Sequence, residues 1–267
     1  MGRPTLGTEA IIGGMKAEAL TGFMRAHYGP QSMVIAAAGA LEHDAVVEMA
    51  RRHFAALPDV GAPGPEPARY TGGEYREEQD LEQVHVVLGF EGLTYDDPQS
   101  HAAMLLSTLL GGGMSSRLFQ EIREKRGLVY SIYSYTQPFA DSGLFAIYAG
   151  TGEKEAAELV PVALEELVRV QRDVTEDELA RAKAQLRASL LMSLESTGSR
   201  CEQLARQWQV HGRIIPTEET KAKIAAVTVA EIEAVAARIF RGRPTLAALG
   251  PAGKVPGLAH IIDRLAA

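Results

Sequence analysis

The sequence GGGMSSRLFQEIREKRGLVYSI, residues 111–132, contains the most specific pattern in this chain of 267 residues. Two serines near its start and the apolar residues Leu118 and Ile122, four positions apart, predict a short helix. Two basic residues followed by Gly127 predict that this helix ends in a left-handed cap. Because the next residues are apolar, aromatic and β-branched, we expect a strand directly after the glycine.

Strand and helix patterns surround this stretch. Residues 128–135 and 144–150 are rich in aromatic and β-branched side chains, so they predict an antiparallel hairpin. The valine-rich run 83–90 predicts a buried strand, and an apolar helix is expected over 98–110. The sequence TEDE at 175–178 is a capping box that starts a long helix. Strands and helices are therefore both expected in the second half of the chain.

A stretch rich in proline and glycine, residues 58–75, divides the chain. It contains four prolines and four glycines, and such a run sustains neither a helix nor a strand ladder. We expect it to be a linker between a front part, residues 1–57, and a rear part, residues 76–267. The front part predicts three elements: a helix over 17–27, an apolar strand over 32–41 and a helix over 43–55.

The two ends of the chain resemble each other at a constant offset of 212 residues. Residues 15–36 and 227–248 both show a helix pattern followed by a strand pattern. If this similarity marks a duplication, the second copy has about 130 residues ahead of the matching point that the first copy lacks. Under that interpretation, the chain begins in the middle of its first domain.

Composition and charge argue against several classes of protein. The chain has 27 Lys and Arg against 34 Asp and Glu, a net charge of −7, so nucleic acid is not expected as a partner. No membrane contact is expected either, because the longest uncharged helical run, 98–116, contains three glycines and several polar residues. The single cysteine, Cys201, favours a reducing compartment. We predict a cytoplasmic location, with the periplasm open if a signal peptide lies upstream.

The seven histidines do not form a zinc motif. Neither H-x-x-E-H nor H-E-x-x-H occurs in the sequence. The best cluster is His43, Glu48 and His53, but on one helix Glu48 and His53 lie about 140° and about 280° around the axis from His43. Three ligands cannot converge in this way, so we expect no metal site in this chain.

Arg123 and Tyr130 are the residues with the clearest chemistry, seven positions apart on either side of the predicted glycine turn. A guanidinium and a phenol facing one cleft can donate hydrogen bonds to a substrate carbonyl and to the oxyanion that forms when water attacks it. On residue types alone a structural interpretation is stronger, since arginines favour a last helical turn and tyrosines favour strands. The glycines at 111–113 lack the spacing of a phosphate loop.

Residues 111–132 resemble the signature of the pitrilysin and mitochondrial processing peptidase family, the insulinase-like inverted zincins. Other segments are similar to the bacterial processing-peptidase branch of that family, and together they extend the resemblance over essentially the whole chain. These segments are residues 2–9, 33–39, 178–186 and 193–196.

The resemblance implies an α+β fold of two homologous domains, each an antiparallel-rich sheet packed with helices, that close like a clamshell on an unfolded peptide. Residues 1–57 would be the rear part of an incomplete first domain, residues 58–75 the linker, and residues 76–267 a complete second domain of the inactive type. The family carries zinc on H-x-x-E-H and a downstream glutamate in its first half. All of these ligands would fall before the first residue of this chain.

By resemblance, Arg123 and Tyr130 match an arginine and a tyrosine that hold the scissile carbonyl and stabilise the tetrahedral intermediate. Gly111, Gly112 and Gly113 match a loop that contacts the substrate. Zinc would belong to the intact enzyme or to a partner subunit, and this chain alone would bind none and be inactive.

We therefore expect the carboxy-terminal part of a zinc-dependent metalloendopeptidase that acts on extended peptides. The alternative is a natural non-catalytic chain that pairs with a zinc-bearing subunit, or a peptide-binding scaffold. A dedicated partner subunit would be expected to keep both domains whole, because half a sheet leaves an open edge and an uncovered apolar face.

Overall fold

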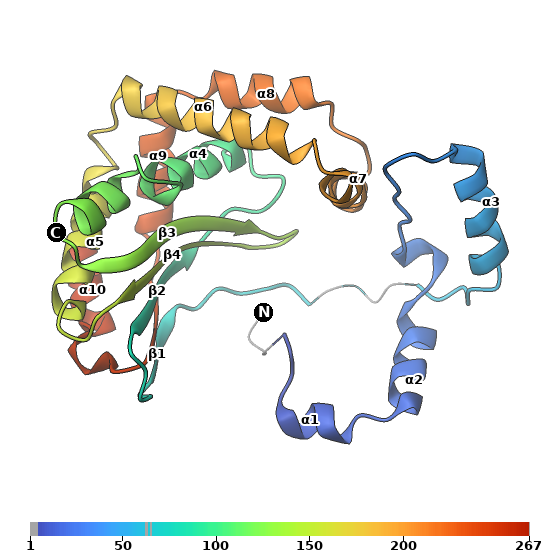
Figure 1. Cartoon of the computed structure of the whole chain (residues 1–267), viewed down its shortest axis with the longest axis horizontal. Coiled ribbons are helices and arrows are strands. Elements are labelled where there is room, and N and C mark those ends of the chain that lie inside the picture. Colours follow the sequence, from blue (N-terminus) through green and yellow to red (C-terminus); the bar gives the residue numbers. More distant parts are fainter. Residues whose placement is uncertain (1–4, 62–63, 65, 267) are drawn as a thin grey trace. The chain divides into compact units, whose positions relative to one another are not determined.

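The computed structural model describes residues 5–61, 64 and 66–266 and divides the chain into two compact units (Figure 1). Unit 1 comprises Met1–Ala68 with Met192–Ile214, and unit 2 comprises Arg69–Leu191 with Ile215–Ala267. Residues 62, 63 and 65 of the predicted linker, and the first three residues of the segment 2–9, lie outside the described part. The domain boundaries predicted from the sequence stay predictions.

Unit 2 contains a five-stranded sheet with the strand order β1-β5-β2-β4-β3. The strands are β1 (Gly73–Glu77), β2 (Val84–Glu91), β3 (Val129–Pro138), β4 (Gly143–Thr151) and β5 (Thr245–Leu249). β1 pairs with β5 in parallel, and the other three pairings are antiparallel. The predicted hairpin is confirmed, with Tyr133 of β3 opposite Tyr148 of β4. β3 therefore forms one edge of a mixed, mostly antiparallel sheet.

Helices cover this sheet and close a single hydrophobic core (Figure 1). They are α4 (Ser100–Gly111), α5 (Ala156–Arg169), α6 (Glu176–Ser193), α8 (Thr217–Ala226), α9 (Val229–Phe240) and α10 (Leu258–Ala266). Alternate residues of β2 are buried, as the two-residue period of a strand requires. One of them, Phe90, packs edge-on against Phe240 of α9 with ring centroids 5.1 Å apart. The α+β class is confirmed.

Unit 1 is built from helices that bury little. They are α1 (Glu9–Gly14), α2 (Ala17–His27), α3 (His43–Phe54) and α7 (Thr197–His211), and none of them contains a buried residue. The helices predicted over 17–27 and 43–55 are confirmed. Among the described residues of the whole chain, no helix is long and apolar enough to span a membrane.

The strand predicted over 32–41 is wrong. A 3-10 turn, Pro30–Ser32, precedes Met33, whose backbone is extended with φ −121° and ψ 139°, but no strand follows it. A strand needs a neighbour to pair with, and the described residues of unit 1 contain none. The apolar pattern is therefore present without the ladder that it normally accompanies.

An apolar groove of about 580 Å³ lies in unit 1, between this extended segment, α3 and α7. Val34, Val46 and Leu204 line it, together with the only tryptophan of the chain, Trp208, which is 53% exposed. Cys201 of α7 donates a hydrogen bond to the carbonyl of Ala36 at 3.1 Å and ties the helix to the segment. Apolar side chains are thus gathered on a surface that the described residues of the unit do not cover.

Candidate functional site

The helix that carries Arg123 is irregular. After two α-helical residues, Arg117 and Leu118, Phe119–Glu124 forms a π-helix, in which the amide of Lys125 donates to the carbonyl of Gln120 at 3.0 Å. Each π turn holds one more residue than an α turn, and such insertions are frequent at functional sites. The fully buried side chains of Leu118 and Ile122 hold the helix on the core. A helix is confirmed here, but the π turn is a finding of the structure.

The helix ends as predicted, at a left-handed glycine. Gly127 has φ 63°, and its amide donates to the carbonyl of Arg123 at 3.1 Å. The amide of Leu128 donates to the carbonyl of Ile122 at 3.0 Å. The bond from Gly127 to Arg123 is the 5→1 bond of an αL cap, in which a residue with a side chain would be strained at position 127. The cap fixes the direction in which β3 leaves the helix.

Tyr130 lies at an irregularity in β3. Val129 pairs with Thr151 of β4, whereas Ser131 pairs with the adjacent residue Gly150, so Tyr130 is an extra residue in the strand. A bulge of this kind bends the strand and turns a side chain out of the regular alternation. The Tyr130 side chain is 78% exposed.

Arg123 and Tyr130 both keep their hydrogen-bond donors free within the described part of the chain. The guanidinium of Arg123 lies 4.8 Å from the centroid of the Phe119 ring, one turn earlier on the same helix. The side chains of Arg123 and Tyr130 make no hydrogen bond or ion pair to another described residue. Both side chains are exposed and come from one helix–turn–strand segment of unit 2. They can donate to a group that arrives from solvent.

The three glycines differ in their surroundings. Gly111 is buried where α4 meets β3, and a Cβ there would lie 2.3 Å from the backbone nitrogen of Ser134. The carbonyl of Gly112 accepts a hydrogen bond from Nε2 of Gln185 at 2.5 Å. A Cβ on Gly113 would meet only the flexible amide of that glutamine, at 3.2 Å. Close packing therefore explains Gly111, whereas Gly112 is exposed and Gly113 is half-buried.

Arg117 starts the helical turn and lies in a partly buried ion cluster. Its side chain is 9% exposed, and its Nε and Nη2 donate to the two carboxylate oxygens of Glu178 at 2.7 and 2.8 Å. Nη1 and Nη2 also donate to the carboxylate and carbonyl of Asp173 at 2.5 and 2.9 Å. Burial raises the pKa of Glu178, but hydrogen bonds from Arg117 and Thr175 outweigh it and lower that pKa to about 2. Glu178 therefore carries a negative charge at neutral pH beside the guanidinium of Arg117.

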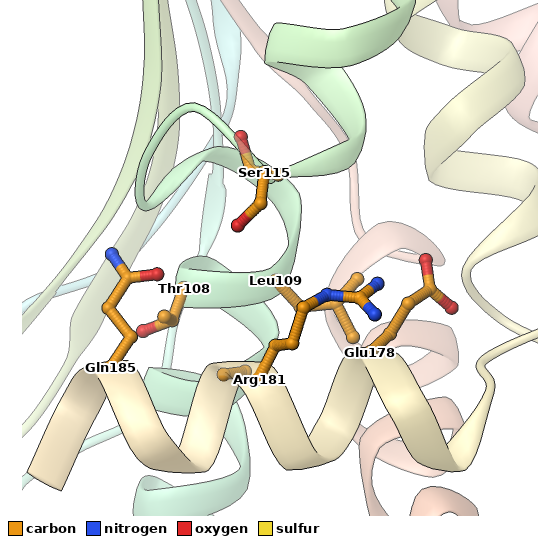
Figure 2. Close-up of a pocket in the computed structure, with 8 residues that line it drawn as sticks. Thr108, Leu109, Ser115, Glu178, Arg181 and Gln185 are labelled. Atoms are coloured by element: carbon orange, nitrogen blue, oxygen red, sulfur yellow. The ribbon is translucent and has the colours of Figure 1, made fainter.

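A small pocket separates the loop after α4 from α6 (Figure 2). Thr108 and Ser115 line one side, and Glu178, Arg181 and Gln185 of α6 line the other. Ser116 also lines it, and its buried hydroxyl has no hydrogen-bond partner among the described residues. The pocket has a volume of about 20 Å³, which suits one water molecule and is too small for a substrate side chain.

The residues that the structure describes do not fit a catalytic zinc ion. Within the described residues, no three His, Cys, Asp or Glu side chains gather in a group that could hold a metal. A zinc site needs at least three such protein ligands around one point.

Residues 14–186 match the family model described as "Peptidase M16 inactive domain". The chain belongs to the peptidase M16 family. The resemblance to the pitrilysin and processing peptidase family is thereby confirmed. The M16 match covers the helix, the cap and the first strand residues described above, so Arg123 and Tyr130 lie inside it.

Curated relatives of this M16 chain are named uncharacterized zinc proteases. One from Streptomyces coelicolor is 39% identical over 261 residues, which cover 94% of this chain and 57% of the relative. One from Rickettsia bellii is 36% identical, and the match covers 94% of this chain and 61% of the relative. YmxG of Bacillus subtilis is 33% identical, and the match covers 96% of this chain and 63% of the relative. The chain thus spans about three fifths of the length of these relatives.

A solved structure shares the fold of this M16 chain. A chain of "Complex III2 from Candida albicans, Inz-5 bound" superposes with a TM-score of 0.91 over 98% of this chain and 66% of that one. The sequence identity is 21%, so this likeness concerns the fold alone.

Proposed function

We propose that this chain supplies the half of a zinc metalloendopeptidase that binds the peptide and stabilises the transition state, and that it acts with a zinc-bearing M16 domain. The observation that carries the proposal is the coincidence of two backbone irregularities with two free donors. Arg123 lies within a π-helix, and Tyr130 lies at a β-bulge. Irregularities of both kinds occur preferentially at functional sites, where they redirect side chains.

The chemistry assigned to this chain is electrostatic. The guanidinium of Arg123 and the phenol of Tyr130 donate hydrogen bonds to the scissile carbonyl of an extended peptide. These bonds strengthen as negative charge develops on the carbonyl oxygen, so they lower the barrier rather than only the dissociation constant. The glycine run 111–113 is proposed to contact the same peptide, with Gly112 as its exposed residue. The metal and the general base are assigned in this proposal to the partner domain; in support, no group of three His, Cys, Asp or Glu among the described residues could hold a metal.

The partner domain is proposed from the surface of unit 1 and from the relatives. Unit 1 leaves an apolar groove uncovered next to an extended segment that pairs with no strand among the described residues. The curated relatives contain further polypeptide beyond the span that this chain matches. A zinc-bearing domain, in the same polypeptide or in a partner subunit, would cover such a face. The predicted cytoplasmic location stays a prediction.

Tyr130→Phe is expected to reduce kcat/KM for peptide hydrolysis about 10-fold, because it removes one neutral hydrogen-bond donor. The assay uses an assembled peptidase, in which this chain replaces the matched part of the Streptomyces coelicolor relative. Tyr133→Phe, three residues further along β3, is the matched control and should leave the rate unchanged. Because Tyr130 is 78% exposed, the melting temperature should not move. Equal rates for both variants would refute the role of Tyr130.

A further inference from the structure

Arg117 lies six residues before Arg123 in the sequence, at the other end of the same helical segment. Its guanidinium makes four hydrogen bonds, all to residues just before or within the first turn of α6. One partner, Glu178, also accepts hydrogen bonds from the amide and hydroxyl of Thr175, at 2.9 and 3.0 Å, in the capping box of α6. The start of the Arg123 helix is thus joined to the start of α6 through one carboxylate.

α6 also makes a hydrogen bond to the glycine run. Gln185 lies two turns beyond Glu178, and its Nε2 donates to the carbonyl of Gly112. Figure 2 shows Glu178, Arg181 and Gln185 along the side of α6 that faces Ser115 and Thr108. The loop from Gly112 to Arg117 is therefore attached to α6 at both of its ends.

The helix would be held on the core without the ion cluster. Leu118 and Ile122 are fully buried and already do so. A buried ion pair adds little net stability compared with apolar side chains of similar size. A bidentate guanidinium does fix direction, because its planar fork matches a carboxylate in only one geometry. Arg117 thus sets how the helix is rotated on its apolar anchor.

The direction of Arg123 depends on that rotation. Its guanidinium contacts the ring of Phe119 on its own helix, and no hydrogen bond to another described residue holds it. If the helix rotated because the contacts of Arg117 were lost, the Arg123 side chain would rotate with it. No hydrogen bond to another described residue would hold the guanidinium in its original direction.

We propose that Arg117, through Asp173 and Glu178, is the positioning residue that aims Arg123 at the scissile carbonyl and keeps the glycine run in register with it. This inference rests on the proposed function. It predicts that Arg117 contributes to kcat through Arg123 and contributes little to KM.

The test uses Arg117→Lys, which keeps the charge and loses the fork, with Arg126→Lys as the matched control on the exposed end of the same segment. In the assembled peptidase, Arg117→Lys should lower kcat about 10-fold with KM within twofold, and Arg126→Lys should change neither. The double variant Arg117→Lys/Arg123→Ala should be no slower than Arg123→Ala alone, because both changes remove one contribution. Multiplicative losses, or an unchanged kcat for Arg117→Lys, would overturn the inference.

A second measurement uses the full chain alone and needs no activity. Hydrogen exchange at the amides of Gly127 and Leu128, which form the helix cap, should accelerate at least 10-fold in Arg117→Lys. Exchange in α9 should be unchanged. Uniform acceleration would mean that Arg117 is only a stability residue. If instead Arg123→Ala leaves kcat intact while the cap amides respond as expected, the proposed function fails and the structural link between Arg117 and the helix stands.

Discussion

Replacing Arg123 by alanine is expected to lower kcat for peptide hydrolysis in the assembled peptidase by about 100- to 1,000-fold. The reason is that a charged donor to a developing oxyanion contributes about 3 to 4 kcal/mol to transition-state stabilisation. The effect should be larger than that of Tyr130→Phe, which removes a neutral donor. KM should change much less than kcat, because the ground-state carbonyl carries little charge.

The exposure of Arg123 makes this test clean. Its side chain is exposed, its guanidinium lies over the ring of Phe119, and it makes no hydrogen bond or ion pair to another described residue, so folding should not depend on it. Arg126→Ala, three residues further along at an exposed position, is the matched control for the loss of one positive charge. If both variants lost the same activity, long-range attraction of the peptide would explain the result and the direct role of Arg123 would be excluded.

Gly111→Ala is expected to destabilise unit 2 by about 3 kcal/mol, at the upper end of overpacking effects. The new Cβ would lie 2.3 Å from the backbone nitrogen of Ser134, and a backbone atom in a paired strand cannot move aside cheaply. The end of α4 or the middle of β3 must shift instead. Thermal unfolding followed by far-UV circular dichroism should show a fall in melting temperature of about 10 °C.

Gly113→Ala is the control for this glycine. Its Cβ would lie 3.2 Å from Nε2 of Gln185, and the end of a flexible side chain can give way. The free energy of unfolding should therefore change by at most about 0.5 kcal/mol. Equal stability of the two variants would show that the close approach of α4 to β3 is not what requires glycine at position 111.

Local patterns were sufficient for much of the fold. The hairpin and the cap at Gly127 depend on residues close together in the sequence, and both are confirmed. The strand predicted over 32–41 depends on a neighbouring strand, and its pattern alone could not supply one. A helix pattern is sufficient in itself because its hydrogen bonds are local, whereas a strand pattern is not.

The details that make the site could not be predicted in the same way. The extra residue at Tyr130 is defined by the register of β3 against β4. The π-helix that contains Arg123 has one more residue in its hydrogen-bonded turn than an α-helix has. The partners of Arg117 lie 56 and 61 residues away in the sequence. The family resemblance made Arg123 and Tyr130 candidates, but only the structure shows the ion cluster at Arg117, at the start of the Arg123 helix.

The alternative function, a non-catalytic partner or peptide-binding scaffold, uses the same surface. It predicts that peptide binding persists while Arg123 and Tyr130 have no effect on any rate. The kinetic experiments above therefore distinguish it from the proposed role.

The most direct test of the central claim compares the assembled peptidase with its two parts, this chain alone and the remaining part of the Streptomyces coelicolor relative alone. A mixture of quenched fluorescent peptides reports hydrolysis in the presence of zinc, and the emission of Trp208 in this chain reports whether its groove is covered. The account predicts that only the assembled protein hydrolyses peptides and that Trp208 emission shifts to shorter wavelength on assembly. Equal hydrolysis by the remaining part alone would contradict it, because this chain would then contribute nothing to the reaction.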